Sequence, residues 1–168
     1  MAGPEEAIIA GGIPAPLRLH ETVAAAEWAD YNGHLSESVY LLVFGDNSDA
    51  FFRYVGVDEA YRAAGRSLYT AETHLHHLRE AGPGERLTLT LQVLGVDAKR
   101  LHIAHEMHNA AGDRIATAEQ MLLHIDTRAE KVAPFPGEIA ARLRQVAAAH
   151  ALLPLPGYIG HVMRIPGV

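Results

Sequence analysis

Four consecutive strand-like segments lie between residues 68 and 126, and this series constrains the fold more than any other feature. The clearest segment runs from residue 87 to 93, where leucine and valine at odd positions alternate with threonine and glutamine. A period of two residues is typical of a half-buried β-strand. Short turn-forming stretches separate the segments, which predicts antiparallel hairpins. The four expected strands are residues 68–78, 87–93, 101–108 and 115–126.

A long helix is expected before these strands. Apolar residues recur at three- and four-residue steps from Val39 to Val55, which predicts a helix over residues 36–55. Ser36 suits its N-cap, and Gly56 suits its end. An antiparallel sheet needs one face covered, so the order of elements predicts an α+β domain in which a curved sheet wraps around one long helix. We also expect a strand at 17–23, a short helix at 58–64 and a surface helix at 138–149.

Composition limits the classes of function. The 168 residues fit one domain, with a lead-in at 1–15, a folded domain at 16–150 and an irregular tail at 151–168. The net charge is −6 and lysine and arginine form no cluster, which argues against nucleic-acid binding. No apolar run reaches the roughly 18 residues of a membrane span, and the acidic start lacks the basic region of a secretory signal. The absence of cysteine excludes thiol nucleophiles and fits a cytoplasmic location.

The segment from Trp28 to Tyr40 joins the first expected strand to the long helix and concentrates chemically useful side chains. Asp30, Asn32, His34 and Glu37 fall within eight residues, beside a glycine and just before the helix. A helix N-terminus offers unpaired N–H groups that can hold a developing oxyanion, and a nearby carboxylate can act as nucleophile or general base. In the alternative interpretation, the aspartate and asparagine only form a turn. The residue types alone leave both interpretations open.

This motif and its surroundings resemble a known enzyme family. The pattern Asp30-x-x-Gly33-His34, followed by Tyr40 and a long helix, resembles hot-dog-fold acyl-CoA thioesterases of the 4-hydroxybenzoyl-CoA thioesterase type. The spacing of Asp30, Asn32 and His34 also resembles the motif of acyl-ACP thioesterases. The chain is most similar to the betainyl-CoA thioesterases of carnitine degradation, which also occur fused to L-carnitine dehydrogenases. Four blocks carry that similarity: DYNGHLSESVY, VFGDNSDAF, YTAETHLHHL and ATAEQMLLHID.

The chain departs from the common family pattern directly after His34. Many family members read His-Val-Asn-Asn, whereas this chain reads His34-Leu35-Ser36-Glu37. The exchange adds a negative charge at Glu37, from which a neutral acyl chain would gain nothing.

The resemblance implies a fold, an assembly and roles for individual residues. Residues 16–150 would form a hot-dog domain, and copies would assemble as a homodimer or homotetramer with the site at the interface between protomers. Asp30 matches the catalytic carboxylate of the family, and would either attack the thioester carbonyl or activate water. Backbone N–H groups near Gly33 and His34 would polarise the carbonyl, while Asn32 and His34 orient Asp30 or the water. The resemblance implies no cofactor, because coenzyme A enters only as part of the acyl-CoA substrate.

Similarity to the betainyl-CoA enzymes further implies a small cationic acyl group. A trimethylammonium group has no N–H to donate, so aromatic faces and carboxylates hold it. The candidates are Trp28, Tyr31, Tyr40 and Tyr69 as aromatic contacts, with Glu37 and Glu72 as charge partners. Cations at strand ends or in turns are candidates for the phosphates of coenzyme A, namely Arg79, Lys99 and Arg100. In the alternative interpretation Tyr40 and Tyr69 pack in the core, Glu72 lies on a solvated face and the cations are simply hydrated.

Other functions make different demands on the residues. His74 and His76 share one face of an expected strand, but no third ligand follows at a recognisable spacing, so we expect no metal. The alternative functions are a thioesterase for another short or aromatic acyl-CoA, a hot-dog dehydratase and a non-catalytic module that binds a ligand in the same cup. A dehydratase would need a histidine-centred site, and a non-catalytic module would tolerate Asp30→Asn.

Overall fold

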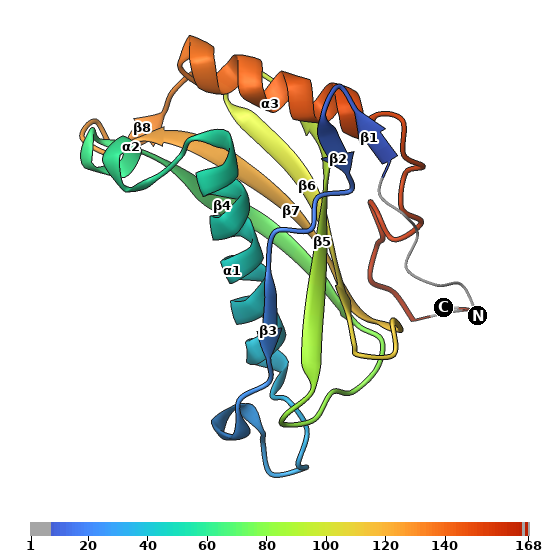
Figure 1. The fold of residues 1–168 in the computed structure, drawn as a ribbon. Helices are drawn as coiled ribbons and strands as arrows, with labels where there is room; N and C mark the ends of the chain where they lie inside the picture. The colour runs from blue at the N-terminus through green and yellow to red at the C-terminus, as the bar shows by residue number, and fades with distance from the viewer. Residues whose placement is uncertain (1–7, 166, 168) are drawn as a thin grey trace.

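The computed structural model describes residues 8–165 and 167, and one curved antiparallel sheet dominates it (Figure 1). This six-stranded sheet has the order β3-β5-β6-β7-β4, with the short strand β8 paired to β7. The four long strands confirm the four strand segments expected between residues 68 and 126. The bounds of the strands are β3 Glu21–Val23, β4 Arg66–His77, β5 Arg86–Val96, β6 Arg100–His108, β7 Arg114–Asp126 and β8 Lys131–Val132.

Helix α1, Glu37–Val55, lies along the inner face of this sheet (Figure 1). Val43, Phe44 and Phe51 are fully buried, because the three- and four-residue spacing places them on the side of the helix that faces the strands. Ser36 occupies the N-cap position as expected, but its side chain makes no capping hydrogen bond. Gly56 ends the helix in the left-handed conformation with φ 95°, which a residue with a Cβ rarely adopts.

A polar network interrupts the apolar contact between α1 and the sheet. The side-chain amide of Asn47 donates to the Thr90 carbonyl at 3.3 Å and to Nδ1 of His105 at 2.9 Å. Because an amide nitrogen only donates, the ring proton of neutral His105 sits on Nε2, which lies 3.1 Å from the carbonyl oxygen of Gln120. Burial lowers the pKa of His105 to about 4, so the ring is uncharged at neutral pH.

Two further helices complete the domain. Helix α2, Glu59–Ala63, begins at Asp58, whose carboxylate accepts a 2.9 Å hydrogen bond from the backbone N–H of Tyr61. Helix α3, Gly137–His150, crosses one end of the sheet and buries Leu143 and Val146 against it (Figure 1). Both helices confirm the elements expected near these positions.

The N-terminal region is more ordered than the sequence predicted. Strands β1, Ile8–Ala10, and β2, Ile13–Ala15, form a hairpin where we expected a loose lead-in. Gly11 and Gly12 both have positive φ, 59° and 79°, so the glycine pair forms the turn of this hairpin. The strand expected at 17–23 is also only partly formed, as β3 together with an isolated bridge between Leu17 and Leu91.

The described tail residues 151–165 and 167 contain no helix or strand, and part of this tail lies on the outer face of the sheet. The hydroxyl of Tyr158 donates to the carbonyl of His105 at 3.1 Å, and the N–H of Gly160 donates to a carboxylate oxygen of Glu119 at 2.7 Å. Burial raises the pKa of the Tyr158 hydroxyl. Among residues 8–165 and 167, no helix is long and apolar enough to cross a bilayer.

Candidate active site

The loop between β3 and α1 closes on itself around Asp30. The backbone N–H of Asp30 donates to the carbonyl of His34 at 2.9 Å, and the N–H of Gly33 donates back to the carbonyl of Asp30 at 3.0 Å. Gly33 has φ 78°, the left-handed conformation that this tight turn needs. The turn therefore fixes Asp30, Asn32 and His34 relative to one another at the start of α1.

The Asp30 carboxylate is half-buried and only partly engaged. Its Oδ1 accepts a 2.7 Å hydrogen bond from the backbone N–H of Asn32. Its Oδ2 makes no hydrogen bond with any residue that the structure describes. The turn thus holds one oxygen of the carboxylate and leaves the other available for chemistry.

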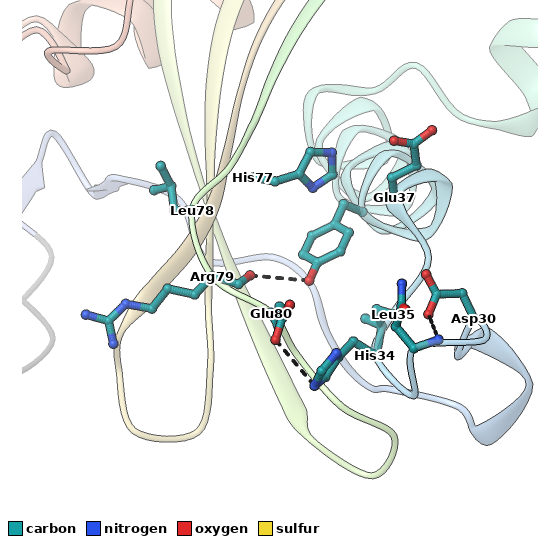
Figure 2. Close-up of a pocket in the computed structure, with 10 residues that line it drawn as sticks. Asp30, His34, Leu35, Glu37, His77, Leu78, Arg79 and Glu80 are labelled. Atoms are coloured by element: carbon teal, nitrogen blue, oxygen red, sulfur yellow. Dashed lines mark hydrogen bonds and ion pairs between the residues drawn. The ribbon is translucent and has the colours of Figure 1, made fainter.

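A cavity of about 310 Å³ lies beside this carboxylate, between the start of α1 and the end of β4 (Figure 2). It is near the lower end of the usual size of small-molecule pockets, which are roughly 300–1,000 Å³. The lining residues are Asp30, Asn32, His34, Leu35, Glu37, Tyr40, His77, Leu78, Arg79 and Glu80.

Tyr40 and His34 are held on the two sides of this cavity by residues from the sheet. The Tyr40 hydroxyl donates to the carbonyl of Arg79 at 3.4 Å, and its ring meets that of His77 edge-on with centroids 4.8 Å apart. Burial raises the pKa of Tyr40, so its hydroxyl keeps its proton. Nε2 of His34 lies 3.4 Å from the carboxylate of Glu80 (Figure 2).

Carboxylates dominate the charge of the cavity. Asp30, Glu37 and Glu80 line it, and the only lysine or arginine among the lining residues is Arg79. The guanidinium of Arg79 pairs with Asp113 at 3.0 Å and points away from His34 in Figure 2. The cavity therefore favours a positive charge in its occupant.

Comparison with known proteins assigns the family. A model of the thioesterase-like superfamily matches residues 24–143 of this chain. The chain belongs to the thioesterase-like superfamily. A betainyl-CoA thioesterase of Pseudomonas aeruginosa is 44% identical over 90% of this chain and 97% of its own length. An L-carnitine dehydrogenase/betainyl-CoA thioesterase of Rhizobium meliloti is 50% identical over 94% of this chain, which spans only 31% of that longer relative.

Solved structures agree with this membership. A Staphylococcus aureus protein determined in complex with CoA superposes with a TM-score of 0.84, is 25% identical, and is matched over 98% of its length and 90% of this chain. The α+β hot-dog fold expected from the sequence resemblance is thereby confirmed.

The structure brings some candidate site residues of this thioesterase-like chain together in the cavity and places the others outside it. Asp30, Asn32, His34 and Glu37 meet in one cavity, as the motif predicted. The N–H of Gly33 is already bonded to the Asp30 carbonyl, whereas the N–H of His34 has no acceptor among the described residues. An oxyanion at this loop would therefore meet the N–H of His34 rather than that of Gly33.

Several predicted substrate contacts lie outside the cavity lining. Trp28 packs half-buried against the core beneath the loop, and Tyr31 is 96% exposed. Tyr69 is exposed on the first half of β4, far along the strand from His77. Glu72 lines a separate cavity of about 210 Å³ on the outer face, and one of its carboxylate oxygens lies 3.4 Å from His74.

The predicted CoA contacts are also separated. Arg79 reaches the cavity lining, but Lys99 in the β5–β6 turn and Arg100 at the start of β6 lie at the other end of the sheet. There Asp97 accepts hydrogen bonds from the backbone N–H groups of both residues and binds the Arg100 side chain at 2.7 Å. These interactions lower the pKa of Asp97 to about 2 and stabilise the turn.

Besides Leu35, which lies within the motif segment, sequence reasoning missed three residues that line the cavity: His77, Leu78 and Glu80. They lie more than 40 positions after the motif in the chain and reach it only because β4 ends beside the start of α1. The block YTAETHLHHL, which ends at Leu78, was the available signal. Among residues 8–165 and 167, no three histidine, aspartate or glutamate side chains are placed where they could hold a metal ion.

Proposed function

We propose that this protein hydrolyses small acyl-CoA thioesters, with betainyl-CoA as its substrate and glycine betaine and CoA as products. The observation that carries the proposal is the Asp30 carboxylate, whose Oδ2 is left unbonded beside a cavity at the start of a helix. The relatives of Pseudomonas aeruginosa and Rhizobium meliloti, which bear the betainyl-CoA thioesterase name, support the choice of substrate.

Two routes remain open for Asp30. As a nucleophile it attacks the thioester carbonyl, releases the CoA thiolate and forms an anhydride that water then hydrolyses. As a general base it takes a proton from water, which attacks the carbonyl directly. In both routes the carbonyl oxygen becomes negative, and the N–H of His34 and the first turn of α1 offer stabilisation. Asn32 and His34 orient Asp30 or the water.

The charge of the cavity supports a cationic acyl group. The trimethylammonium of a betainyl group would lie among carboxylates in a cavity without an unpaired lysine or arginine. Tyr40 supplies an aromatic ring, and Glu37 supplies the carboxylate by which this chain departs from the common family motif. A neutral acyl chain would gain nothing from the carboxylate of Glu37.

We further propose that the active unit is a homo-oligomer joined at β4. This strand is the last in the sheet order, and no strand of the described chain pairs with its outer edge. Long unpaired edges recruit another strand. Antiparallel pairing of two β4 strands about a two-fold axis would place the first half of one strand beside the second half of the other. Tyr69 and Glu72 would then lie close to the partner's β4, with Glu72 on the outer face of the joined sheet, so their contact with substrate stays a prediction.

The remaining assignments follow from the substrate. Arg79, Lys99 and Arg100 stay candidates for the phosphates of coenzyme A, and the assembly decides whether the last two reach a partner's cavity. The cysteine-free sequence fits action in the reducing cytoplasm.

A thiol-release assay with two acyl-CoAs of equal shape and different charge tests the function. Betainyl-CoA and 3,3-dimethylbutanoyl-CoA differ only by nitrogen in place of one carbon. We expect kcat/KM to be about tenfold higher for betainyl-CoA, which corresponds to about 1.4 kcal/mol and lies within the range of one or two cation contacts at roughly 0.5–2 kcal/mol each. Acetyl-, benzoyl- and medium-chain acyl-CoAs complete the panel.

The outcomes separate the alternatives. Equal rates for the charged and neutral pair, or a preference for a benzoyl or longer neutral chain, would reject the cationic substrate and keep the thioesterase. No thiol release from any acyl-CoA, together with saturable binding of one of them, would identify a non-catalytic binding module.

A further inference from the structure

Glu80 lies at the cavity without any role in the reaction described so far. It follows β4 by three residues and lines the same cavity as Asp30 (Figure 2). Its carboxylate lies 3.4 Å from Nε2 of His34, and no lysine or arginine of the described chain pairs with it. The imidazole of His34 is therefore the polar group that this carboxylate meets.

The backbone, rather than side-chain attraction, brings the two residues together. The N–H of Leu35 donates to the carbonyl of Ala81 at 2.8 Å, so the residues directly after His34 and Glu80 are hydrogen-bonded to each other. Leu35 and Ala81 are both buried, which shields this bond from water. The fold thus places Glu80 beside His34 whatever the ionic strength.

A carboxylate beside one ring nitrogen determines how a histidine works. It favours a proton on the nitrogen that it faces, which leaves the other nitrogen as the acceptor, and it limits rotation of the ring. Here Glu80 faces Nε2, so Nδ1 becomes the acceptor nitrogen of a neutral His34.

We propose that Glu80 is a positioning residue that fixes the ring orientation and tautomer of His34 during thioester hydrolysis. The inference rests on the proposed function, because His34 orients Asp30 or the attacking water there. Glu80 acts through His34 and does not touch the reacting atoms.

The exposure of the pair separates this role from a role in folding. The side chains of His34 and Glu80 are 44% and 75% exposed, and exposed ion pairs contribute little to stability. Replacing Glu80 should therefore change the reaction while leaving the fold intact.

The test compares Glu80→Gln with a matched control, Glu27→Gln. Glu27 is exposed in the same loop region, outside the cavity lining, so its replacement removes one negative charge and no cavity contact. With the best acyl-CoA of the panel, we expect Glu80→Gln to lower kcat about tenfold with little change in KM, because the ring of His34 would then keep its working orientation and tautomer only part of the time. Glu27→Gln should retain the wild-type kcat, and both variants should unfold at the wild-type temperature.

A double variant and a spectroscopic measurement complete the test. In a His34→Gln background, Glu80→Gln should cost nothing further, because a positioning residue has no effect without the group that it positions. Nitrogen-15 NMR of the His34 ring should show the proton on Nε2 in the wild type and a mixture of tautomers in Glu80→Gln.

Each contrary result has a distinct meaning. An unchanged kcat in Glu80→Gln, equal losses in Glu80→Gln and Glu27→Gln, or additive losses with His34→Gln would overturn the role of Glu80 in an active thioesterase. An unchanged ring tautomer in Glu80→Gln would overturn it even if no acyl-CoA were hydrolysed. A wild-type protein that hydrolyses no acyl-CoA would instead refute the proposed function on which the inference rests.

Discussion

The carboxylate of Asp30 accepts a 2.7 Å hydrogen bond from the backbone N–H of Asn32 through one oxygen only. This hydrogen bond is the one expected from the turn-forming interpretation of the motif, since an aspartate side chain commonly accepts a hydrogen bond from the backbone N–H two residues ahead. The cavity beside the other oxygen leaves room for the catalytic role proposed for Asp30. The two interpretations are compatible, because the turn orients the carboxylate that the proposed reaction would use.

Replacing Asp30 by asparagine should abolish most of the activity without unfolding the protein. The amide keeps the shape and can still accept the Asn32 hydrogen bond, but it neither attacks a thioester nor takes a proton from water. We expect kcat to fall about 10²–10⁴-fold, as measured by thiol release. Circular dichroism and thermal unfolding should match the wild type. Full-rate hydrolysis by this variant would rule out Asp30 as nucleophile or base.

Two glycine-to-alanine substitutions should have opposite effects on stability. Gly33 has φ 78°, so Gly33→Ala forces a left-handed conformation that costs about 1–2 kcal/mol, although the added Cβ meets no atom within 4 Å. Gly45 lies inside α1, and its Cβ would also meet nothing within 4 Å, so Gly45→Ala should stabilise by up to about 1 kcal/mol. Urea unfolding measures both. Equal effects would contradict the backbone conformations described.

Acid should destabilise the protein before its carboxylates are protonated. The pKa of His105 is about 4 in the folded state, against an ordinary value of 6.5, so the unfolded chain binds more protons between these values. The free energy of unfolding should therefore fall by about 2 kcal/mol from pH 7 to pH 5. Burial also lowers the pKa of His150, which acts in the same direction.

Two variants test whether His105 causes this pH dependence of the unfolding free energy. His105→Gln keeps a polar side chain that does not titrate, and its unfolding free energy should vary less between pH 7 and pH 5. His161→Gln replaces an exposed histidine and should retain the wild-type dependence. A wild-type stability that stays flat over this range would contradict the buried neutral state of His105.

The N-cap of α2 offers a test of local stability away from the cavity. Asp58 accepts a 2.9 Å hydrogen bond from the N–H of Tyr61, and an alanine at this position leaves that donor without its partner. Asp58→Ala should lower the free energy of unfolding by about 1 kcal/mol and leave kcat unchanged. An unaltered unfolding midpoint would show that the cap contributes nothing.

Local periodicity predicted the scaffold well because each main element carries its own signal. The alternation from Leu87 to Val93 and the helical spacing from Val39 to Val55 each report which face is buried, and the structure confirms both. The hairpin at Ile8–Ala15 was missed, although the pair Gly11-Gly12 is a common hairpin turn.

The part of the site that is contiguous in sequence was predictable from its spacing, and of the distant lining residues only Arg79 was among the candidates. Asp30, Asn32, His34 and Glu37 lie on one loop and one helix start, so their proximity follows from their spacing. Glu80 reaches them through the sheet topology, which no local pattern reports. For the same reason the sequence did not indicate that Lys99 and Arg100, which resemble ordinary turn cations, lie at the opposite end of the sheet.

The hydrogen bonds from Asn47 to Thr90 and His105 have a consequence for the distant cavity. Apolar side chains alone would let a helix slide or rotate on a sheet at little cost in free energy, because one apolar contact can replace another. Hydrogen bonds are directional and cannot be exchanged in this way, since any displacement of the helix leaves a buried donor without its acceptor. Asn47 therefore fixes α1 on the sheet. By preventing the helix from sliding, it holds the N-terminus of α1 in register with the cavity where the proposed thioester would bind.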